Sequence, residues 1–301
     1  MPHRTANPTP APNRGYTYAG RVDARSAGRT LIDYLTQRYP HGSAVEWRER
    51  IAAGRVRVGG HTVSADTTLR RGDTVTWARP PWVEPAAPLR YTVLLEDAAF
   101  VAVAKPAGLP TLPGGGYLEH TLLALVRAHY PEAAPAHRLD RGASGIVLFT
   151  RTPEAARAIA LAWREQRVEK VYHALVEGRP VQDAFTIETP IGRSAHPARG
   201  AVFAADPAGK PARSELRVLE RRERTSLVEI RLATGRPHQA RIHLAACGHP
   251  LLGDPLYAAG GGLREAPGRP GDAGYHLHAI RLAFPHPESG ERVDIHCPPP
   301  D

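Results

Sequence analysis

A proline-rich segment constrains the fold of this chain more than any other feature of its sequence. Residues 80–89, PPWVEPAAPL, contain four prolines, which disfavour a helix or an interior strand and favour a stiff, extended linker. We therefore expect a compact module at 16–79 and a larger domain at 90–297. Residues 1–15 also hold four prolines and show no hydrophobic periodicity, so a disordered tail is expected there.

The charge balance favours a polyanionic partner. The chain has 39 Lys and Arg residues against 30 Asp and Glu residues, a net charge of +9. Only three of the basic residues are Lys, and together with 30 Pro and 28 Gly this usage is typical of a GC-rich genome. Such a bias explains Arg in place of Lys but not the excess of base over acid. Nucleic acid is the first candidate partner, and a basic enzyme without such a partner is the alternative.

Membrane and secretory features are absent from the sequence pattern. The longest apolar stretches, such as 100–104 and 146–149, have the length of strands and fall far short of the roughly 20 residues of a membrane span. The first 15 residues lack the apolar core of a signal peptide. Two cysteines, Cys247 and Cys297, are too few for a disulfide framework or a four-cysteine zinc site. We expect a cytoplasmic protein.

The module at 16–79 is predicted to contain two helices followed by a hairpin. Apolar residues recur at helical spacing and then alternate with polar ones, and Gly59-Gly60 is typical of a two-residue hairpin turn. The module carries 11 basic and 6 acidic residues, a net charge of +5. The expected elements are helices at 29–39 and 45–53, a strand at 55–58, a return strand starting at 61–63 and a closing strand at 74–77.

The larger domain mixes strands and helices without the regular alternation of a doubly wound sheet, so an α+β fold is expected. Strands are predicted where apolar and polar residues alternate or apolar residues run together, and helices where the period is near 3.6. The expected strands are 91–96, 100–105, 145–150, 169–177 and 226–232, and the expected helices are 122–129, 153–166 and 237–247.

One acidic residue stands where a substrate could reach it. Asp140, in HRLDRGASG at 137–145, precedes a small-residue turn and an apolar strand, which places it on a loop at the end of a sheet. Arg138 and Arg141 flank it, and nearby cations keep a carboxylate ionised as a nucleophile or base. Taken alone, an acid in an arginine-rich loop is more often part of a structural ion pair.

Two further segments complete the candidate chemistry. Tyr172 shares a strand face with Lys170 in EKVYHA, although a tyrosine on a strand usually packs in a core. His238 and Arg241 are three residues apart in a predicted helix and can face one site. His238 and His243 are five apart and do not share a helical face. With no HExxH motif and no cysteine pair, no metal site is predicted.

Taken together, these motifs resemble one family. HRLDRGASG, KVYHA and TGRPHQARIHLAACGHPLLGDPLY, in this order, resemble an RluA-type pseudouridine synthase, with KPAGLP at 105–110 and LHA at 277–279. The resemblance runs from about residue 20 to 297. Ala143, Pro237 and Ala240 depart from the commoner family residues, and the glycine-rich stretch 258–274 looks like a poorly ordered loop expansion.

The module resembles an S4 RNA-binding domain. In that family the second helix and the adjoining hairpin bind structured RNA. The matching segment of this chain holds Arg48, Arg50, Arg55 and Arg57, which the resemblance assigns to RNA binding. The alternative is that these arginines are only a solvated helix face.

The resemblance implies an isomerase that converts a uridine of ribosomal RNA or tRNA to its C-glycoside isomer without a cofactor, most simply as a monomer. Asp140 would be the catalytic carboxylate, and Arg241 would pair with it and hold it ionised. Tyr172 would stack on the target base and help to take the proton from C5, and His238 would contact the substrate. Because a base inside a helix must be extruded before it can react, Arg138 would fill the vacated space.

Two alternatives remain open at this stage. An inactive RNA-binding protein, such as a ribosome assembly factor, would have the same charge and module. It would not need Asp140, Tyr172 and Arg241 together, so their joint presence favours the enzyme. A glycosidase would need two carboxylates flanking the bond, whereas the motif supplies one acid among arginines.

Overall fold

The computed structural model describes residues 11–40, 42–196, 200–268 and 272–299. By its internal contacts the chain separates into two compact units, Met1–Glu84 and Pro85–Asp301. The division falls inside the proline-rich segment, and residues on each side of the division pack within their own unit. Glu84 is buried and accepts a hydrogen bond of 2.7 Å from Asn13 Nδ2, whereas Ala87 packs on the core of the larger unit.

The expected disordered tail at 1–15 differs from the structure where the structure describes it. Residues 1–10 lie outside the described residues. Asn13 is buried, and its backbone N–H donates to the Trp82 carbonyl at 3.0 Å. Its side-chain oxygen accepts hydrogen bonds from the N–H groups of Gly15 and Trp82. These contacts fix Asn13 because an asparagine side chain can both donate to a carboxylate and accept from the backbone.

The smaller unit consists of two helices and a three-stranded antiparallel sheet of order β1-β3-β2. Thr30 and Ser43 cap the two helices, and Ser43 forms a reciprocal capping box with Glu46. The apolar faces of both helices meet the sheet in a core that includes Leu31, Leu35 and Trp47. The elements are β1 (Tyr16–Arg21), α1 (Leu31–Arg38), α2 (Ala44–Ala52), β2 (Val56–Val58) and β3 (Thr74–Arg79).

The expected return strand at 61–63 is wrong. Val58 and His61 exchange backbone hydrogen bonds around Gly59-Gly60, so the tight turn forms, but β2 pairs along its length with β3. Beyond the turn, the carbonyls of residues 65 and 67 accept hydrogen bonds from the N–H groups of Ile32 and Leu31. The segment therefore satisfies the unpaired donors in the first turn of α1 instead of extending a hairpin.

The larger unit has the expected α+β fold, built on a ten-stranded sheet. The path β4-β5-β7-β14-β8-β13-β12-β9 is antiparallel except for the parallel pair β7 and β14, with β15 added on β14 and β6 on β7. The strands are β4 (Thr92–Glu96), β5 (Phe100–Lys105), β6 (Ala134–Pro135), β7 (Ser144–Thr150), β8 (Glu169–Glu177), β9 (Ala184–Ile187), β12 (Ser214–Arg221), β13 (Thr225–Leu232), β14 (Leu277–Pro285) and β15 (Arg292–His296). A separate hairpin consists of β10 (Ile191–His196) and β11 (Gly200–Ala205).

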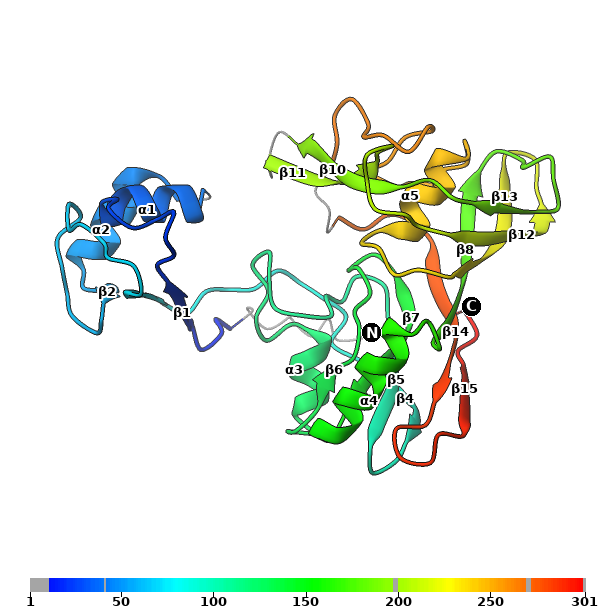
Figure 1. The fold of residues 1–301 in the computed structure, drawn as a ribbon, viewed down its shortest axis with the longest axis horizontal. Coiled ribbons are helices and arrows are strands. Elements are labelled where there is room, and N and C mark those ends of the chain that lie inside the picture. Colours follow the sequence, from blue (N-terminus) through cyan, green and yellow to red (C-terminus); the bar gives the residue numbers. More distant parts are fainter. Residues whose placement is uncertain (1–10, 41, 197–199, 269–271, 300–301) are drawn as a thin grey trace, which may run out of the picture. The chain divides into compact units, whose positions relative to one another are not determined.

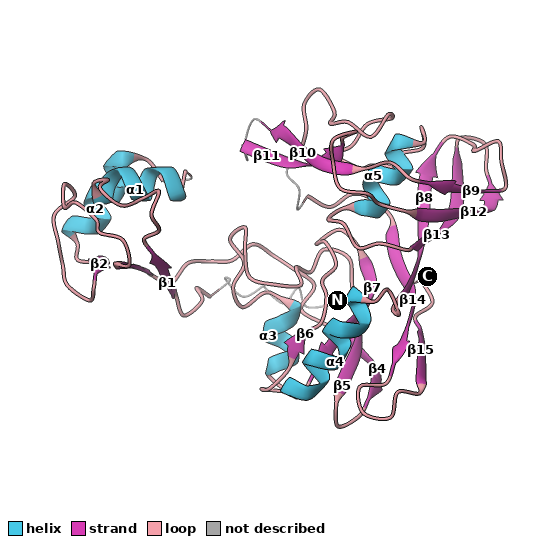
Figure 2. Ribbon diagram, viewed as in Figure 1, coloured by secondary structure: helices cyan, strands magenta, loops and turns pink. Residues whose placement is uncertain are grey.

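Helices cover the two halves of this sheet separately. Helices α3 (Leu122–Arg127) and α4 (Pro153–Arg164) lie beside β5, β6 and β7, and α5 (Gln239–Ala246) lies beside β8 and β13 (Figure 1). The same arrangement is visible when the ribbon is coloured by helix and strand (Figure 2). The strands β7, β14 and β8 connect the two halves, so the loop before β7 and the turn before α5 come close to each other. No helix among the described residues is long and apolar enough to cross a membrane.

Helix α5 is shorter than the predicted helix 237–247. It begins at Gln239 because His238 has a left-handed backbone conformation, with φ 55° and ψ 20°. The glycine-rich stretch 258–274, expected to be poorly ordered, is tied down in its described part. His196 Nε2 lies 3.0 Å from the Gly268 carbonyl, and the Gly260 N–H donates to Ala245 O. Residues 269–271 lie outside the described residues.

Candidate active site

Asp140 occupies a tight turn immediately before β7. The Ala143 N–H donates to the Asp140 carbonyl at 3.1 Å and closes the turn. A side chain at position 142 would place its Cβ 2.8 Å from the ring of Tyr275, so only glycine fits there. The Asp140 side chain on this turn is 18 % exposed.

The segment from Lys105 to Thr111 holds the backbone of this turn by hydrogen bonds. Thr111 Oγ1 donates to the Leu139 carbonyl at 2.7 Å and accepts from the Leu139 N–H at 3.3 Å. Lys105, which is buried, donates to the Leu109 carbonyl at 2.7 Å and to the Arg141 carbonyl at 3.4 Å. Burial lowers the pKa of Lys105 to about 7. These contacts hold the backbone on both sides of Asp140.

Arg241 is buried and is held mainly by a second carboxylate. Its Nε and Nη2 donate to the two Asp254 oxygens, each at 2.8 Å, while its Nη1 lies 3.4 Å from Asp140 Oδ2. The guanidinium also lies over the rings of Tyr275 and Tyr257, at 4.4 and 5.0 Å. The expected pairing of Arg241 with Asp140 is therefore the weaker of its two ion pairs.

Asp254 is as deeply buried as the arginine it holds. Burial by itself would raise the pKa of its carboxyl, but the hydrogen bonds and charge of Arg241 and two backbone N–H groups lower it below its usual range. Those N–H groups belong to Leu256 and Tyr257. Because Asp254 is fully engaged, Asp140 is the carboxylate of the pair that remains available to a substrate.

His238 lies on the other side of Asp140. Its Nε2 is 3.5 Å from Asp140 Oδ2, and its Nδ1 is 2.7 Å from the Tyr257 hydroxyl. Although His238 precedes the helix instead of lying within it, it faces the same carboxylate as Arg241. The cause is Gln239, whose buried side chain accepts from Arg236 N and Thr234 Oγ1 and donates to Arg213 O and Ser214 Oγ.

Tyr172 lies on β8 with its ring in the main core of the larger unit. That core also contains Leu139 and Ala143, which flank Asp140 in the sequence. Burial, and then the charge of Asp140, raise the pKa of the Tyr172 phenol well above its usual value. The hydroxyl therefore stays protonated at neutral pH, and the side chain is 9 % exposed.

Arg138 is the most exposed member of the group. Its side chain is 68 % exposed, with Nη2 4.0 Å from Asp140 Oδ1. Arg138 thus lies near one oxygen of Asp140, and His238 and Arg241 lie near the other. The arrangement places one available carboxylate among cations and aromatic rings, which suits nucleophilic or base chemistry on a substrate that reaches the surface.

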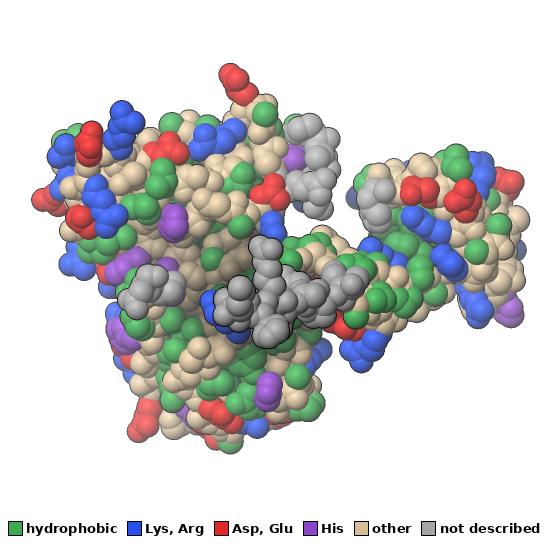
Figure 3. Space-filling model, turned by 180° about the vertical axis from the view of Figure 1, so that it is seen from behind, with side chains coloured by type: hydrophobic (Ala, Val, Ile, Leu, Met, Phe, Trp, Pro, Cys, Tyr) green, Lys and Arg blue, Asp and Glu red, His purple; other side chains and the backbone are tan. Residues whose placement is uncertain are grey.

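The four arginines that the resemblance assigns to RNA binding do not share one environment. Arg48, Arg55 and Arg57 are exposed, whereas Arg50 is partly buried. The Arg50 guanidinium lies over the rings of Trp47 and Trp77, at 4.5 and 5.2 Å, and 3.6 Å from Glu46. The expected RNA-binding role therefore fits Arg50 least well, since cation–π packing already holds it. Figure 3 shows basic side chains at the surface of this unit.

The sequence did not indicate several residues that surround the site. Gln239, Asp254 and Tyr257 lie inside the segment TGRPHQARIHLAACGHPLLGDPLY, but nothing in their spacing indicates a role. Thr111 and Tyr275 had no signal at all, because their contacts join segments far apart in the chain.

No group of three or more His, Cys, Asp or Glu side chains among the described residues could hold a metal ion.

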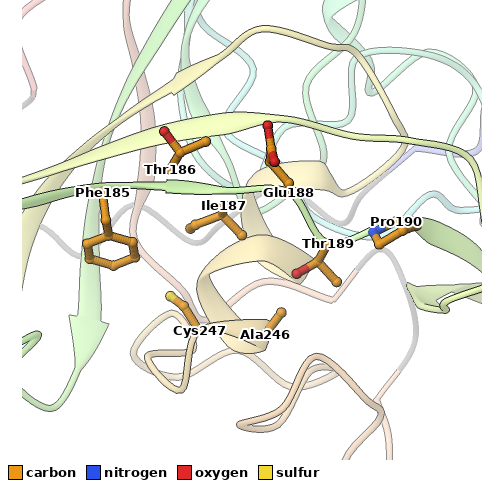
Figure 4. A pocket seen from close by; sticks show the side chains of 8 residues that line it. All are labelled: Phe185, Thr186, Ile187, Glu188, Thr189, Pro190, Ala246 and Cys247. Carbon is orange, nitrogen blue, oxygen red and sulfur yellow. The ribbon is translucent and has the colours of Figure 1, made fainter.

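A surface pocket lies apart from Asp140, between β9 and the end of α5. It is lined by Phe185–Pro190, Ala246 and Cys247 (Figure 4). None of the candidate site residues lines it.

Comparisons with known proteins converge on one activity. Residues 99–246 match the family model described as RNA pseudouridylate synthase, and this range includes Asp140, Tyr172, His238 and Arg241. The chain is 40 % identical over 275 residues to an uncharacterised RNA pseudouridine synthase of Synechocystis sp., covering 90 % of this chain and 94 % of that protein. It is 35 % identical to RNA pseudouridine synthase 5 of Arabidopsis thaliana, covering 95 % of this chain and 92 % of the relative.

A relative named for the large ribosomal subunit and a solved structure are also similar to this chain. Ribosomal large subunit pseudouridine synthase D of Neisseria meningitidis serogroup B is 38 % identical, covering 94 % of this chain and 76 % of the relative. Human RNA pseudouridylate synthase domain containing 1 has a similar structure, with a TM-score of 0.58 and 28 % identity. That similarity covers 72 % of this chain and 86 % of the human one.

Proposed function

This chain belongs to the RNA pseudouridine synthases of the RluA type, and we propose that Asp140 is the carboxylate with which it isomerises a uridine in folded RNA. The reaction breaks the N-glycosidic bond, turns the uracil and joins C5 to C1′, with no redox change and no net hydrolysis. One observation carries the assignment. Asp140 is partly exposed, and it is contacted by a buried arginine that a second carboxylate holds in place.

Arg241 holds the Asp140 side chain in place. Its guanidinium cannot turn away, because Asp254 accepts two of its hydrogen bonds and two tyrosine rings lie against it. The guanidinium Nη1 lies 3.4 Å from Oδ2 and so fixes the position of the Asp140 side chain. A carboxylate at a fixed position can act as a nucleophile on the substrate or as a base.

Tyr172 and Arg138 help to extrude and hold the target base and do not take part in breaking the N-glycosidic bond. A uridine in an RNA helix must leave the stack before its glycosidic bond can be reached, at a cost of a few kcal/mol. Tyr172 offers a ring beside Asp140 on which the extruded base stacks. Arg138 is exposed and planar, so its guanidinium can occupy the space that the base leaves and hydrogen-bond there.

The smaller unit binds the RNA outside the target site. Arg48, Arg55 and Arg57 are exposed near the end of α2 and on β2, and they contact phosphates in the manner of an S4 domain. Ribosomal RNA is the first substrate to test, since a relative is named for the large ribosomal subunit. The tRNA pool is the second substrate to test.

We further propose that the enzyme works as a cytoplasmic monomer and without a cofactor.

The decisive experiment replaces Asp140 by Asn, which keeps the shape of the side chain but removes its charge and nucleophilicity. Pseudouridine formation on a short, pre-folded stem-loop, assayed with EDTA and no added cofactor, should fall by at least about 10⁴-fold, while RNA binding stays within threefold. The control is Asp183→Asn, an equal substitution at an exposed position. A variant that kept a tenth of the wild-type turnover would refute the role of Asp140.

The substrate is tested separately from the chemistry. Pseudouridine is mapped across ribosomal RNA and tRNA in cells with and without the gene, and in cells that carry only the Asp140→Asn variant. The target sites are those that lose pseudouridine both in cells without the gene and in cells that carry only the Asp140→Asn variant. An inactive binding protein would leave every site unchanged, and the purified wild-type enzyme would then make no pseudouridine on any RNA.

A further inference from the structure

The hydrogen bonds of Tyr257 determine which nitrogen of His238 carries a proton. The Tyr257 hydroxyl donates its single hydrogen to the Phe203 carbonyl at 2.8 Å. The same oxygen lies 2.7 Å from His238 Nδ1, and both contacts are hydrogen bonds only if Nδ1 donates, so we assign the ring proton to Nδ1. Burial raises the pKa of Tyr257, which keeps the hydroxyl protonated and preserves this arrangement.

The opposite nitrogen of the ring therefore presents a lone pair to Asp140. Burial lowers the pKa of His238. Arg241 and Arg138 add to that effect, and the charges of Asp140 and Asp254 oppose it. At neutral pH the ring is uncharged, with its proton on Nδ1 and Nε2 bare. Nε2 lies 3.5 Å from Asp140 Oδ2, so two acceptors face each other until a proton arrives between them.

The isomerisation requires such a proton to move. Once C5 has joined C1′, C5 is tetrahedral and still carries its hydrogen. That C–H bond must break, and its electron pair forms the C5=C6 double bond. The former C6=N1 π pair then moves to N1, which takes up a proton. The net change is the transfer of one proton from C5 to N1, with no other reactant.

We propose that Asp140 and His238 form a proton-sharing pair that accepts the C5 proton on Asp140 Oδ2, with His238 Nε2 as its hydrogen-bond acceptor, and returns it to N1. This proposal rests on the assignment of Asp140 made above. Tyr172 is a poor alternative base because its phenol stays protonated, and Arg241 is permanently charged. His238 acts through Asp140 and is therefore a positioning and proton-holding residue.

The test uses two substitutions that the left-handed backbone at position 238 tolerates. His238→Asn places an amide donor near Tyr257 but has no counterpart of Nε2, and Asn is among the residues that adopt this conformation most readily. His238→Gly leaves a space that free imidazole can enter. The control is His249→Asn, whose Nδ1 contacts only the Glu177 carbonyl among the interactions identified for that side chain.

Single-turnover rates are measured on one stem-loop whose target uridine carries hydrogen or deuterium at C5. His238→Asn should lower the rate by about 10²–10⁴-fold without weakening RNA binding, and should reveal a C5 deuterium isotope effect. Imidazole should restore part of the rate of His238→Gly. A rate within threefold of the wild type would overturn the proposal. So would a lowered rate with neither an isotope effect nor imidazole rescue, since that result indicates a structural role.

The outcome separates this proposal from the proposed function. If Asp140→Asn is inactive and His238→Asn shows no isotope effect, the role of Asp140 stands and the proton-sharing pair fails. If Asp140→Asn retains activity, the assignment of the carboxylate itself has failed, and the pair fails with it.

Discussion

Arg241 pairs with two carboxylates, one structural and one proposed to be catalytic. A buried guanidinium is costly unless it is paired, and Asp254 pairs it from within the protein while Asp140 is only partly buried. The two carboxylates thus divide the work. Asp254 anchors the arginine, and Asp140 is left available to the substrate.

Replacing Asp254 by Asn should destabilise the larger unit by about 3–5 kcal/mol, because it leaves a buried charge without its main partner. Turnover should fall as well, since Arg241 is no longer held. Calorimetry measures the first effect and a pseudouridine assay the second. The control is Asp294→Asn, which breaks an ion pair with Arg281 near the surface and should cost less than about 1 kcal/mol. Equal costs for the two variants would contradict the anchoring role.

The contribution of Asp254 to the free energy of unfolding also depends on pH in a defined way. Its pKa in the folded protein lies below the usual value of 3.8, so the folded state binds its proton less readily than the unfolded state does. The stabilisation is complete above the unfolded pKa and is lost as the pH falls through the lowered folded pKa. The difference in stability between the wild type and Asp254→Asn should therefore be constant from pH 5 to 7 and shrink below about pH 4.

Arg138 should matter most when the target base is firmly held. Arg138→Ala should lower kcat/KM more on a stable stem-loop than on an unstructured oligomer of the same sequence, because the role proposed for Arg138 is to offset the cost of extruding the base. Both substrates are assayed at one salt concentration. Arg138 also lies 4.0 Å from Asp140, so a direct effect on the carboxylate would lower both rates by the same factor. Equal losses would remove the base-flipping role.

Among the elements, the parallel pair β7 and β14 is the least expected and the most important for the site. It joins Ser144 to His278 and Gly145 to Ala279, immediately after the turn that carries Asp140. The Ser144 hydroxyl is 2.9 Å from His278 Nδ1, which adds a side-chain contact to the junction. Strands 145–150, 169–177 and 226–232 were expected from their apolar patterns, but nothing in those patterns indicates which strands become neighbours.

Gly145→Ala tests this junction. Gly145 has a φ of 106°, and a Cβ there would lie 2.3 Å from the Ala279 carbonyl oxygen. The matched control is Gly248→Ala, with a φ of 90° and nothing within 4 Å of the added Cβ. Both variants share the backbone strain of a positive φ, and only the first adds a clash with backbone. The thermal transition of the larger unit should fall by roughly 4–8 °C more for Gly145→Ala, the equivalent of about 2 kcal/mol. Equal shifts would show that the junction tolerates a side chain.

At the scale of the whole molecule, most of the net charge and the candidate active site lie in different units. The smaller unit contains exposed arginines, and Asp140, Tyr172, His238 and Arg241 all lie in the larger one. Affinity for RNA and turnover should therefore respond to different substitutions.

The triple variant Arg48→Gln, Arg55→Gln and Arg57→Gln should weaken RNA binding while leaving the maximal turnover within about threefold of the wild type. Each lost phosphate contact should lower the slope of log affinity against log salt by about 0.7–0.9. The matched control removes three exposed arginines of the larger unit, Arg157, Arg164 and Arg167, with the same change in net charge. If the two triple variants had the same slope, general charge and not the smaller unit would account for RNA affinity.

The sequence by itself determined the α+β class, most of the central elements of the larger unit and the identity of the candidate carboxylate. Apolar periodicity and short motifs are local properties, and a turn such as HRLDRGASG carries its own signal. Only the tertiary structure decided that Asp254 holds Arg241, that Thr111 braces Leu139 and that Tyr257 orients His238. These contacts depend on which distant segments the sheet brings together, because a buried polar group takes the partner that packing places within hydrogen-bond distance.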